Sequence, residues 1–237
     1  HSRVLFPVIG RLLLRAPHEG RADGAFSPAE SAASAGDLLW GGGHLAMAVC
    51  AARAFARHGW PTRMFGAEAG RVDGLPVVPN PNEPGGVWGP GDLQLPDRRL
   101  DEPPQIGMNP LVAIPNSDGC MLLGGVSVRR PVVTQEVGAH DAALEVSLPY
   151  QQVANILSAH LFEVAPQLHG LGEAEVQQRL LGSLAALLGI GLDDAESIQV
   201  GVGTSPDAPG QTVVQVRIVP PARIAPGGLV MTFGLAV

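Results

Sequence analysis

The spacing of apolar residues predicts three helices in this chain. Within residues 38–58, apolar side chains recur at intervals of three and four, the period of an amphipathic helix: Leu45, Val49, Ala52, Phe55 and Ala56. Gly41–Gly43 precede this helix, and Gly59 follows it as a C-terminal cap. The same period predicts a helix over 142–167 and another over Glu173–Leu188, where leucines and valine form one apolar face.

Apolar runs with β-branched residues predict the strands. The segment 3–15 is apolar almost throughout and is typical of a buried strand, or of a strand with a short turn. Shorter strands are predicted at 60–65, 92–95, 109–114 and 120–128, with a brief helix at 97–106. The C-terminal part is all strand, with Pro/Gly turns between the predicted segments 197–202, 212–219 and 229–237.

Glycine and proline predict the loops. Residues 18–36 are typical of a loop, and 66–91 are so rich in Gly, Pro and Asn that we expect a long, exposed and mobile surface loop. Strands and helices are mixed without strict alternation, so the fold class is α/β (α+β), a mixed β-sheet flanked by helices. We expect a single domain over 1–237.

Charge and composition exclude several functions. The chain has 15 basic residues, all arginine, against 22 acidic ones, a net charge of −7. Without lysine there is no Schiff base and no P-loop, and without a basic run we expect neither nucleic-acid binding nor an anionic-membrane patch. No apolar run is long enough to span a bilayer, so we expect no membrane insertion. No signal-peptide pattern is present, so the cytoplasm is the expected compartment, and the start at His1-Ser2 indicates a fragment.

Candidate catalytic groups are scattered. The sharpest signal is Gly41-Gly42-Gly43-His44 before a helix, which fits either a tight strand-to-helix connection or an anion site. Cys50 and Cys120 are 70 positions apart in apolar surroundings, typical of buried reduced thiols. The histidines lack metal-ligand spacing: His1, His18, His44, His58, His140, His160 and His169. We therefore predict no catalytic residue, no cofactor and no metal.

Several weak motifs in a fixed order resemble one protein family. The stretch LLWGGGHLAMAVCAARAFARHGW followed by RVDGLPVV is similar to a W-G-N/G-x-x-x-A start, a helix ending F-x-x-x-G-W and an R/x-V-x-G-L-P-V segment. The motif positions are Trp40, Gly41, Gly59, Trp60, Gly74, Leu75 and Pro76. DLQLPDRRLDE, MNPLVAI, LGGVSVRRP and the last two helices and strands follow in the family's order. The chain thereby resembles the large subunit of the type VI secretion contractile sheath.

The resemblance implies a structural role. It implies that the chain is the C-terminal region of a longer subunit that polymerises around an inner tube and contracts to propel it. The implied partners are a small sheath subunit, further copies of this chain and the inner tube protein. The family's R-F-x-H-Y-x-K helix is altered here, since 155–160 reads NILSAH. The alternative is an α/β enzyme or a ligand-binding domain that uses the helix start at Gly41–His44.

The resemblance also implies the candidate interaction residues. In the sheath family the last strands join a sheet shared with neighbouring subunits, so we expect inter-subunit pairing by linker strands within 211–237. The residues that would pair are Val213, Val214, Val216, Ile218, Met231 and Phe233. The competing interpretation is a hairpin that closes the chain's own sheet.

Overall fold

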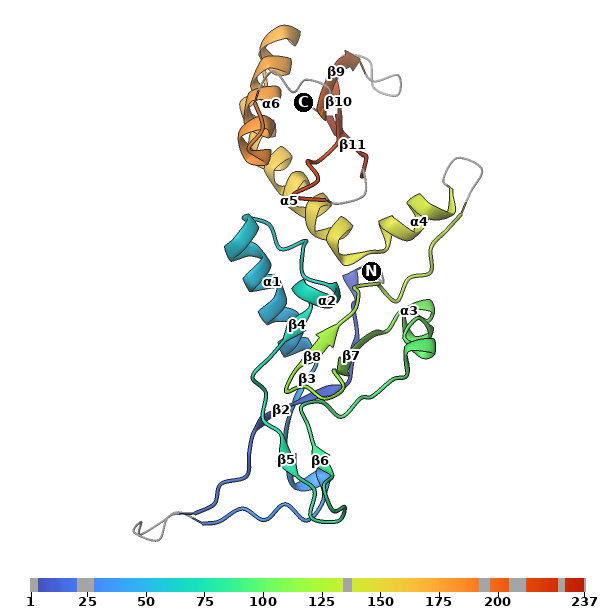
Figure 1. The fold of residues 1–237 in the computed structure, drawn as a ribbon. Helices are drawn as coiled ribbons and strands as arrows, with labels where there is room; N and C mark the ends of the chain where they lie inside the picture. Colours follow the sequence, from blue (N-terminus) through green and yellow to red (C-terminus); the bar gives the residue numbers. More distant parts are fainter. Residues whose placement is uncertain are drawn as a thin grey trace. The chain divides into compact units, whose positions relative to one another are not determined.

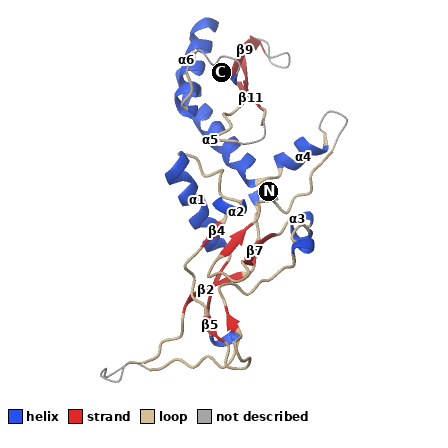
Figure 2. Cartoon of the chain, in the orientation of Figure 1, coloured by secondary structure: helices blue, strands red, loops and turns tan. Residues whose placement is uncertain are grey.

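The computed structural model describes residues 4–20, 28–133, 138–191, 197–204, 212–225 and 229–236. It has helices and several small sheets, so the α+β class predicted from the sequence is confirmed (Figure 2). The chain divides into two compact units, 1–148 and 149–237, which are described separately here. The single functional domain predicted over 1–237 stays a prediction.

The first unit is built from short elements (Figure 1). Its helices are α1 (His44–His58), α2 (Gly66–Ala69), α3 (Glu102–Gln105) and α4 (Ala139–Glu145), with 3-10 turns at Ala35–Asp37 and Asp97–Arg99. Its strands are β1 (Val8–Ile9), β2 (Arg11–Arg15), β3 (Leu39–Gly42), β4 (Arg71–Val72), β5 (Val78–Pro79), β6 (Val87–Trp88), β7 (Asn109–Ala113) and β8 (Cys120–Leu122).

Three sheets organise this unit. The largest has the order β1-β7-β8-β4, with β1 parallel to β7 and the other pairs antiparallel. β2 pairs with β3, and β5 pairs with β6. One buried face of α1, formed by Ala46, Cys50 and Ala54, packs with Leu111 and Leu122 of the main sheet into a common apolar core.

The buried amide side chain of Asn109 connects the main sheet to two other segments of the first unit. Asn109 on β7 is fully buried, and its Nδ2 donates to the carbonyl oxygens of Pro7 (3.0 Å) and Val126 (2.9 Å). Its Oδ1 accepts from the Val126 N–H at 2.6 Å. A single side chain therefore satisfies three backbone groups in segments that lie far apart in the sequence.

The second unit has longer and more regular elements. It contains α5 (Leu148–Val164), which a 3-10 turn at Ala165–Gln167 follows, and α6 (Glu173–Leu188). Its antiparallel sheet has the order β11-β10-β9, with β9 at Ile198–Thr204, β10 at Thr212–Ile218 and β11 at Met231–Ala236. The helix predicted at Glu173–Leu188 and all three C-terminal strands are confirmed.

Several predictions for the first unit are wrong. Residues 60–65 and 92–95 form turns and irregular backbone instead of strands, and β8 ends at Leu122. The segment 66–91 is not a structureless loop, since it contains α2, β4 and the β5–β6 pair, and Val78 in it is buried. Its mobility stays a prediction. These elements are too short for their periodicity to be visible in the sequence.

The helix predicted over 142–167 is interrupted. α4 ends at Glu145 and α5 begins at Leu148, because the backbone between them pairs with another segment. The Ser127 N–H donates to the Val146 carbonyl oxygen at 2.9 Å, and Val126 forms a bridge with Ser147. Pro149 is the second residue of α5, a place where a proline is tolerated because its missing N–H would have no partner within the helix.

Candidate interaction surface

The three-stranded sheet of the second unit contains all six residues predicted to pair between subunits. Val213, Val214, Val216 and Ile218 lie on β10, whereas Met231 and Phe233 lie on β11. The structure pairs these strands with each other within the chain: Val216 lies opposite Phe233, and Ile218 lies opposite Met231. The pairing is therefore the internal antiparallel ladder that the competing interpretation predicts.

Five of the six side chains share one face of the sheet. Side chains alternate between faces along a strand, so Val214, Val216 and Ile218 point the same way, and all three are fully buried. Met231 and Phe233 lie opposite them on β11 and share that face. Val213 is on the other face, with the exposed Gln215 and Arg217. Side chains on the buried face of this sheet form part of the core of the second unit.

β10 offers no free edge to another strand. It is paired with β9 on one side from Thr212 to Ile218 and with β11 on the other from Val213 to Ile218. The two outer edges of the sheet belong to β9 and β11. Any strand that joins this sheet from another subunit must therefore add beside β9 or β11, and the four predicted residues of β10 would lie one strand away from it.

The two outer edges differ in what occupies them. α6 packs along β9, and the Gln177 Nε2 donates to the carbonyl oxygen of Val200 on β9 at 3.3 Å. For β11, among the described residues, the only backbone pairing is with β10. Neither β11 nor β9 contains a charged residue or a proline, the usual means by which natural proteins protect an edge strand, so the edges differ only in the contact that α6 makes with β9.

An arginine fixes the end of α6 beside this sheet. The Arg223 Nη2 donates to the carbonyl oxygen of Gly189 at 2.8 Å and also to that of Leu188. These carbonyls lie at the negative end of the helix dipole, where a cation is favourable. Sequence reasoning missed both Arg223 and Gln177, because nothing local distinguishes either residue from other polar surface positions.

The glycines before α1 have a packing role. A Cβ at Gly43 would meet Val8 Cγ1 at 2.6 Å and the Gly10 carbonyl oxygen at 2.8 Å, and one at Gly41 would meet Leu14. The Gly43 N–H already donates to Gly10 O at 3.0 Å, so it is not free to hold an anion. These contacts support the tight strand-to-helix connection over the anion site.

The cysteines are buried in the core of the first unit. Both thiols are free, as predicted, and belong to the same apolar cluster. Burial raises the pKa of the Cys120 thiol to about 11, and the Asp92 carboxylate adds to this shift. Burial also raises the pKa of Cys50, although Arg53 opposes the effect. Both side chains stay protonated near neutral pH, so neither is an activated nucleophile.

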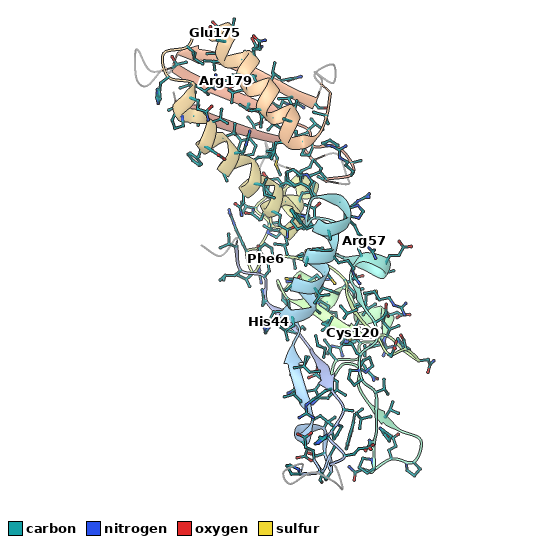
Figure 3. The ribbon with its side chains drawn as sticks, turned by 90° about the vertical axis from the view of Figure 1, so that its left-hand side faces the viewer. Phe6, His44, Arg57, Cys120, Glu175 and Arg179 are labelled. Carbon is teal, nitrogen blue, oxygen red and sulfur yellow. The ribbon has the colours of Figure 1, made fainter. Side chains whose placement is uncertain are left out.

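The remaining candidate groups do not gather. Figure 3 labels His44 at the start of α1 and Cys120 on β8, and no hydrogen bond joins them among the described residues. Within the same part of the chain, no group of three His, Cys, Asp or Glu residues could hold a metal ion. The side chain of His140 lies outside the described residues. None of the described helices is long and apolar enough to cross a membrane.

Among the described residues, β11 leaves one edge of the sheet without a further strand, and both cysteines are buried and free. A family model described as "VipB: EvpB/VC_A0108, tail sheath N-terminal domain" matches residues 1–129, more than half of the chain. The chain therefore belongs to the tail sheath family of type VI secretion systems, as its sequence predicts, and is a sheath large-subunit family member. This is a family of structural sheath proteins.

A curated relative supports membership of the same family. The type VI secretion system sheath protein TssC1 of Pseudomonas aeruginosa is 32% identical over 157 residues, which cover 63% of this chain and 32% of the relative. The match to the family model ends at residue 129, before the division between the two units. That model describes the N-terminal domain of the sheath protein, so the place of the chain in the C-terminal half stays a prediction.

Proposed function

We propose that this chain polymerises with a small sheath subunit and further copies of itself around an inner tube, and that contraction of the assembly propels the tube. Membership of the tail sheath family is the observation that carries the proposal. Repeated contacts between unlike surfaces generate open helical polymers, the geometry that a sheath requires. Contraction then rotates and repacks subunits that stay connected.

The connection between subunits is proposed to form at the outer edge of β11. A strand from a neighbouring subunit would add to this edge by main-chain hydrogen bonds, which tolerate many side-chain sequences. Because such a connection involves a peripheral strand, it can persist while the bodies of the subunits rotate. In this proposal Met231 and Phe233 lie on the pairing strand, and Val213, Val214, Val216 and Ile218 support it from β10.

Paired lysines provide a matched test of the β11 edge. Thr232 and Gly234 on β11 lie opposite Arg217 and Gln215, and Gln199 and Gly201 on β9 lie opposite the same two residues from the other side. All four are exposed and share one face. The double variants T232K/G234K and Q199K/G201K therefore add the same charge at equivalent positions of the two edges.

The two double variants should behave differently in assembly. Co-expressed with the small subunit, the β9 variant should form tubes of normal length by negative-stain electron microscopy, whereas the β11 variant should form none. Circular dichroism should show both folded. Normal tubes from the β11 variant would refute the connection at this edge. Deletion of 229–237 is a poorer test, because it removes the buried side chains of Leu229, Met231 and Leu235.

The proposed role needs no catalysis. His44→Ala should leave assembly unchanged, since the side chain of this residue serves no step of the proposal. The alternative ligand-binding function would be favoured if the chain eluted as a monomer with or without the small subunit and bound a small anion. Size-exclusion chromatography in the presence of the partner, with phosphate titrations in parallel, separates the two functions.

A further inference from the structure

A cleft in the first unit is lined by β6 and by the turn that joins β7 to β8. It has a volume of about 780 Å³, within the range of about 300–1,000 Å³ that is usual for ligand sites. Its apolar lining comes from separate parts of the chain: Val77, Val87, Leu95 and Ile114. Val77 and Val87 are 41% and 57% exposed, so the cleft presents apolar surface to solvent and to other molecules.

Three prolines make the wall of the cleft rigid. Pro90, Pro96 and Pro115 belong to its lining, and each has a fixed φ and lacks an N–H. A wall of this kind loses little conformational freedom when a partner binds. It also has no backbone donor at these three positions, so recognition depends on apolar contacts and on polar side chains.

A single carboxylate gives the cleft its charge. Asp118 is the only ionisable residue in the lining, it is exposed, and within the described ranges no ion pair includes it. The neighbouring Ser117 Oγ accepts from the Arg71 Nη2 at 3.3 Å, but the Nε of the same arginine pairs with Asp73 at 2.5 Å. Because the charges of Arg71 and Asp73 compensate each other, this end of the cleft is negative and favours a cationic side chain.

One exposed segment of the same unit has the complementary chemistry. Residues 128–133 read VRRPVV, and the three valines and Arg130 are all exposed. In the part of the chain that the structure describes, no ion pair includes Arg130 and no backbone hydrogen bond involves residues 130–133. Pro131 disfavours helical backbone at Arg130. The segment therefore offers apolar side chains and a cation on main chain that is free to dock.

We propose that residues 128–133 of one copy of this chain dock in the cleft of a second copy. Arg130 pairs with Asp118, and the valines of the segment contact the apolar lining at Val87 and Ile114. The segment and the cleft are different surfaces of one unit, so copies connect head to tail and form an open assembly. This contact is separate from the β11 edge, and peptide binding to the cleft can be measured without tube formation.

A peptide of the segment tests the contact directly. The labelled peptide VSVRRPVV, which is the sequence of residues 126–133, is compared with a twin that has Glu in place of each Arg. Fluorescence anisotropy with the full chain should show that the arginine peptide binds at least tenfold more tightly and that added salt weakens its binding. Equal binding of the two peptides, or binding of neither, would overturn the inference.

Matched variants locate the binding to the cleft. Asp118→Ser should weaken binding of the arginine peptide about fivefold or more, whereas Glu68→Ser, at an exposed carboxylate of α2, should not. Val87→Lys should abolish binding, whereas Val49→Lys, at an exposed valine of α1, should not. Circular dichroism verifies that all four variants fold. Equal effects of a variant and its control would refute the site.

Charge reversal and self-association complete the test. Asp118→Arg should bind the glutamate twin more tightly than the arginine peptide, an exchange of preference that a purely structural role of Asp118 would not produce. Sedimentation equilibrium of the full chain should show a mean mass that rises with concentration, and a smaller rise for Asp118→Ser. A wild-type chain that stays monomeric while it binds the peptide would contradict docking between copies and would assign the cleft to a similar segment of another protein.

Discussion

Different kinds of interaction stabilise the interior of each of the two compact units. Apart from the 15-residue helix α1, the first unit consists of short helices and of strands of two to five residues, joined in part by side chains that bond to distant backbone, such as Asn109 and Arg53. The second has two helices of 17 and 16 residues and strands of six or seven, with a periodic apolar face on each. The first unit therefore depends in part on single side-chain hydrogen bonds to backbone, whereas the second depends on apolar contacts that repeat along each helix and strand.

This difference affects how each unit should respond to substitution. Where one side chain satisfies several buried backbone groups, its removal takes a partner from each of them; at Asn109 the two Val126 backbone groups lose their bond to the amide, whereas the Pro7 carbonyl oxygen keeps the Asn109 N–H at 3.0 Å. Where apolar contacts repeat along a helix or strand, each position contributes a smaller share. We therefore expect the largest losses of stability at single polar or glycine positions of the first unit.

The largest effect is expected at Asn109. Asn109→Leu removes three hydrogen bonds from the core of the first unit and should lower its free energy of unfolding by roughly 4 kcal/mol. Urea titration followed by the fluorescence of the tryptophans, all of which lie in the first unit, measures this change. Gln94→Leu, at an exposed position of the first unit, is the control. A loss below about 1 kcal/mol would mean that water replaces the amide.

Two glycine-to-alanine substitutions, one in each unit, should change the stability in opposite directions. A Cβ at Gly70 would collide with the carbonyl oxygen of Leu122, so Gly70→Ala should destabilise the first unit by about 2–3 kcal/mol. A Cβ at Gly182, inside α6, would meet nothing within 4 Å, so Gly182→Ala should stabilise the second unit by about 0.5–1 kcal/mol. Thermal unfolding of both variants measures the signs. If both variants changed the unfolding temperature in the same direction, the expected difference between the two units would be contradicted.

A smaller effect is expected at the end of α6. Arg223→Met keeps an unbranched apolar side chain but removes the hydrogen bonds to Gly189 and Leu188, and it should cost about 1 kcal/mol. Arg217→Met on the exposed face of β10 serves as the matched control. Hydrogen exchange should show faster exchange in the last turn of α6 only for the first variant. Unchanged protection there would mean that Arg223 does not support the helix end.

The smallest effect concerns the Arg15–Glu30 ion pair of the first unit. Hydrogen bonds from the Arg15 guanidinium and the His18 N–H lower the pKa of Glu30 to about 2. The folded pKa is below the unfolded value near 4.5, so the contribution to stability is present above about pH 4.5 and disappears as the pH falls through 2.

Both groups are exposed, so the gain in stability is small. Carboxyl NMR should place the titration of Glu30 near pH 2 in the wild type and at a higher pH in Arg15→Gln. A titration midpoint that does not move in this variant would assign the low pKa to the backbone hydrogen bond alone.

The sequence predicted the elements that are long enough to show a period. α1 and α6 end at Gly59 and Gly189, both of which adopt the left-handed conformation that glycine tolerates. β9 and β10 appear where β-branched residues recur, and β11 where apolar residues alternate with others. The family resemblance also depended on local motifs, and the comparisons confirm it. For the candidate site, the sequence predicted the strands but not which of them lies in the centre of the sheet.

Only the tertiary structure decided the features that depend on distant partners. Strands such as β1 and β4, each of two residues, exist because other segments bond to them, and residues 66–91 are ordered into elements for the same reason. The position of β10 between β9 and β11 follows from pairing across two turns, which no local pattern encodes. Local periodicity reports which face of an element is apolar, whereas order and register are set by contacts between segments far apart in the chain.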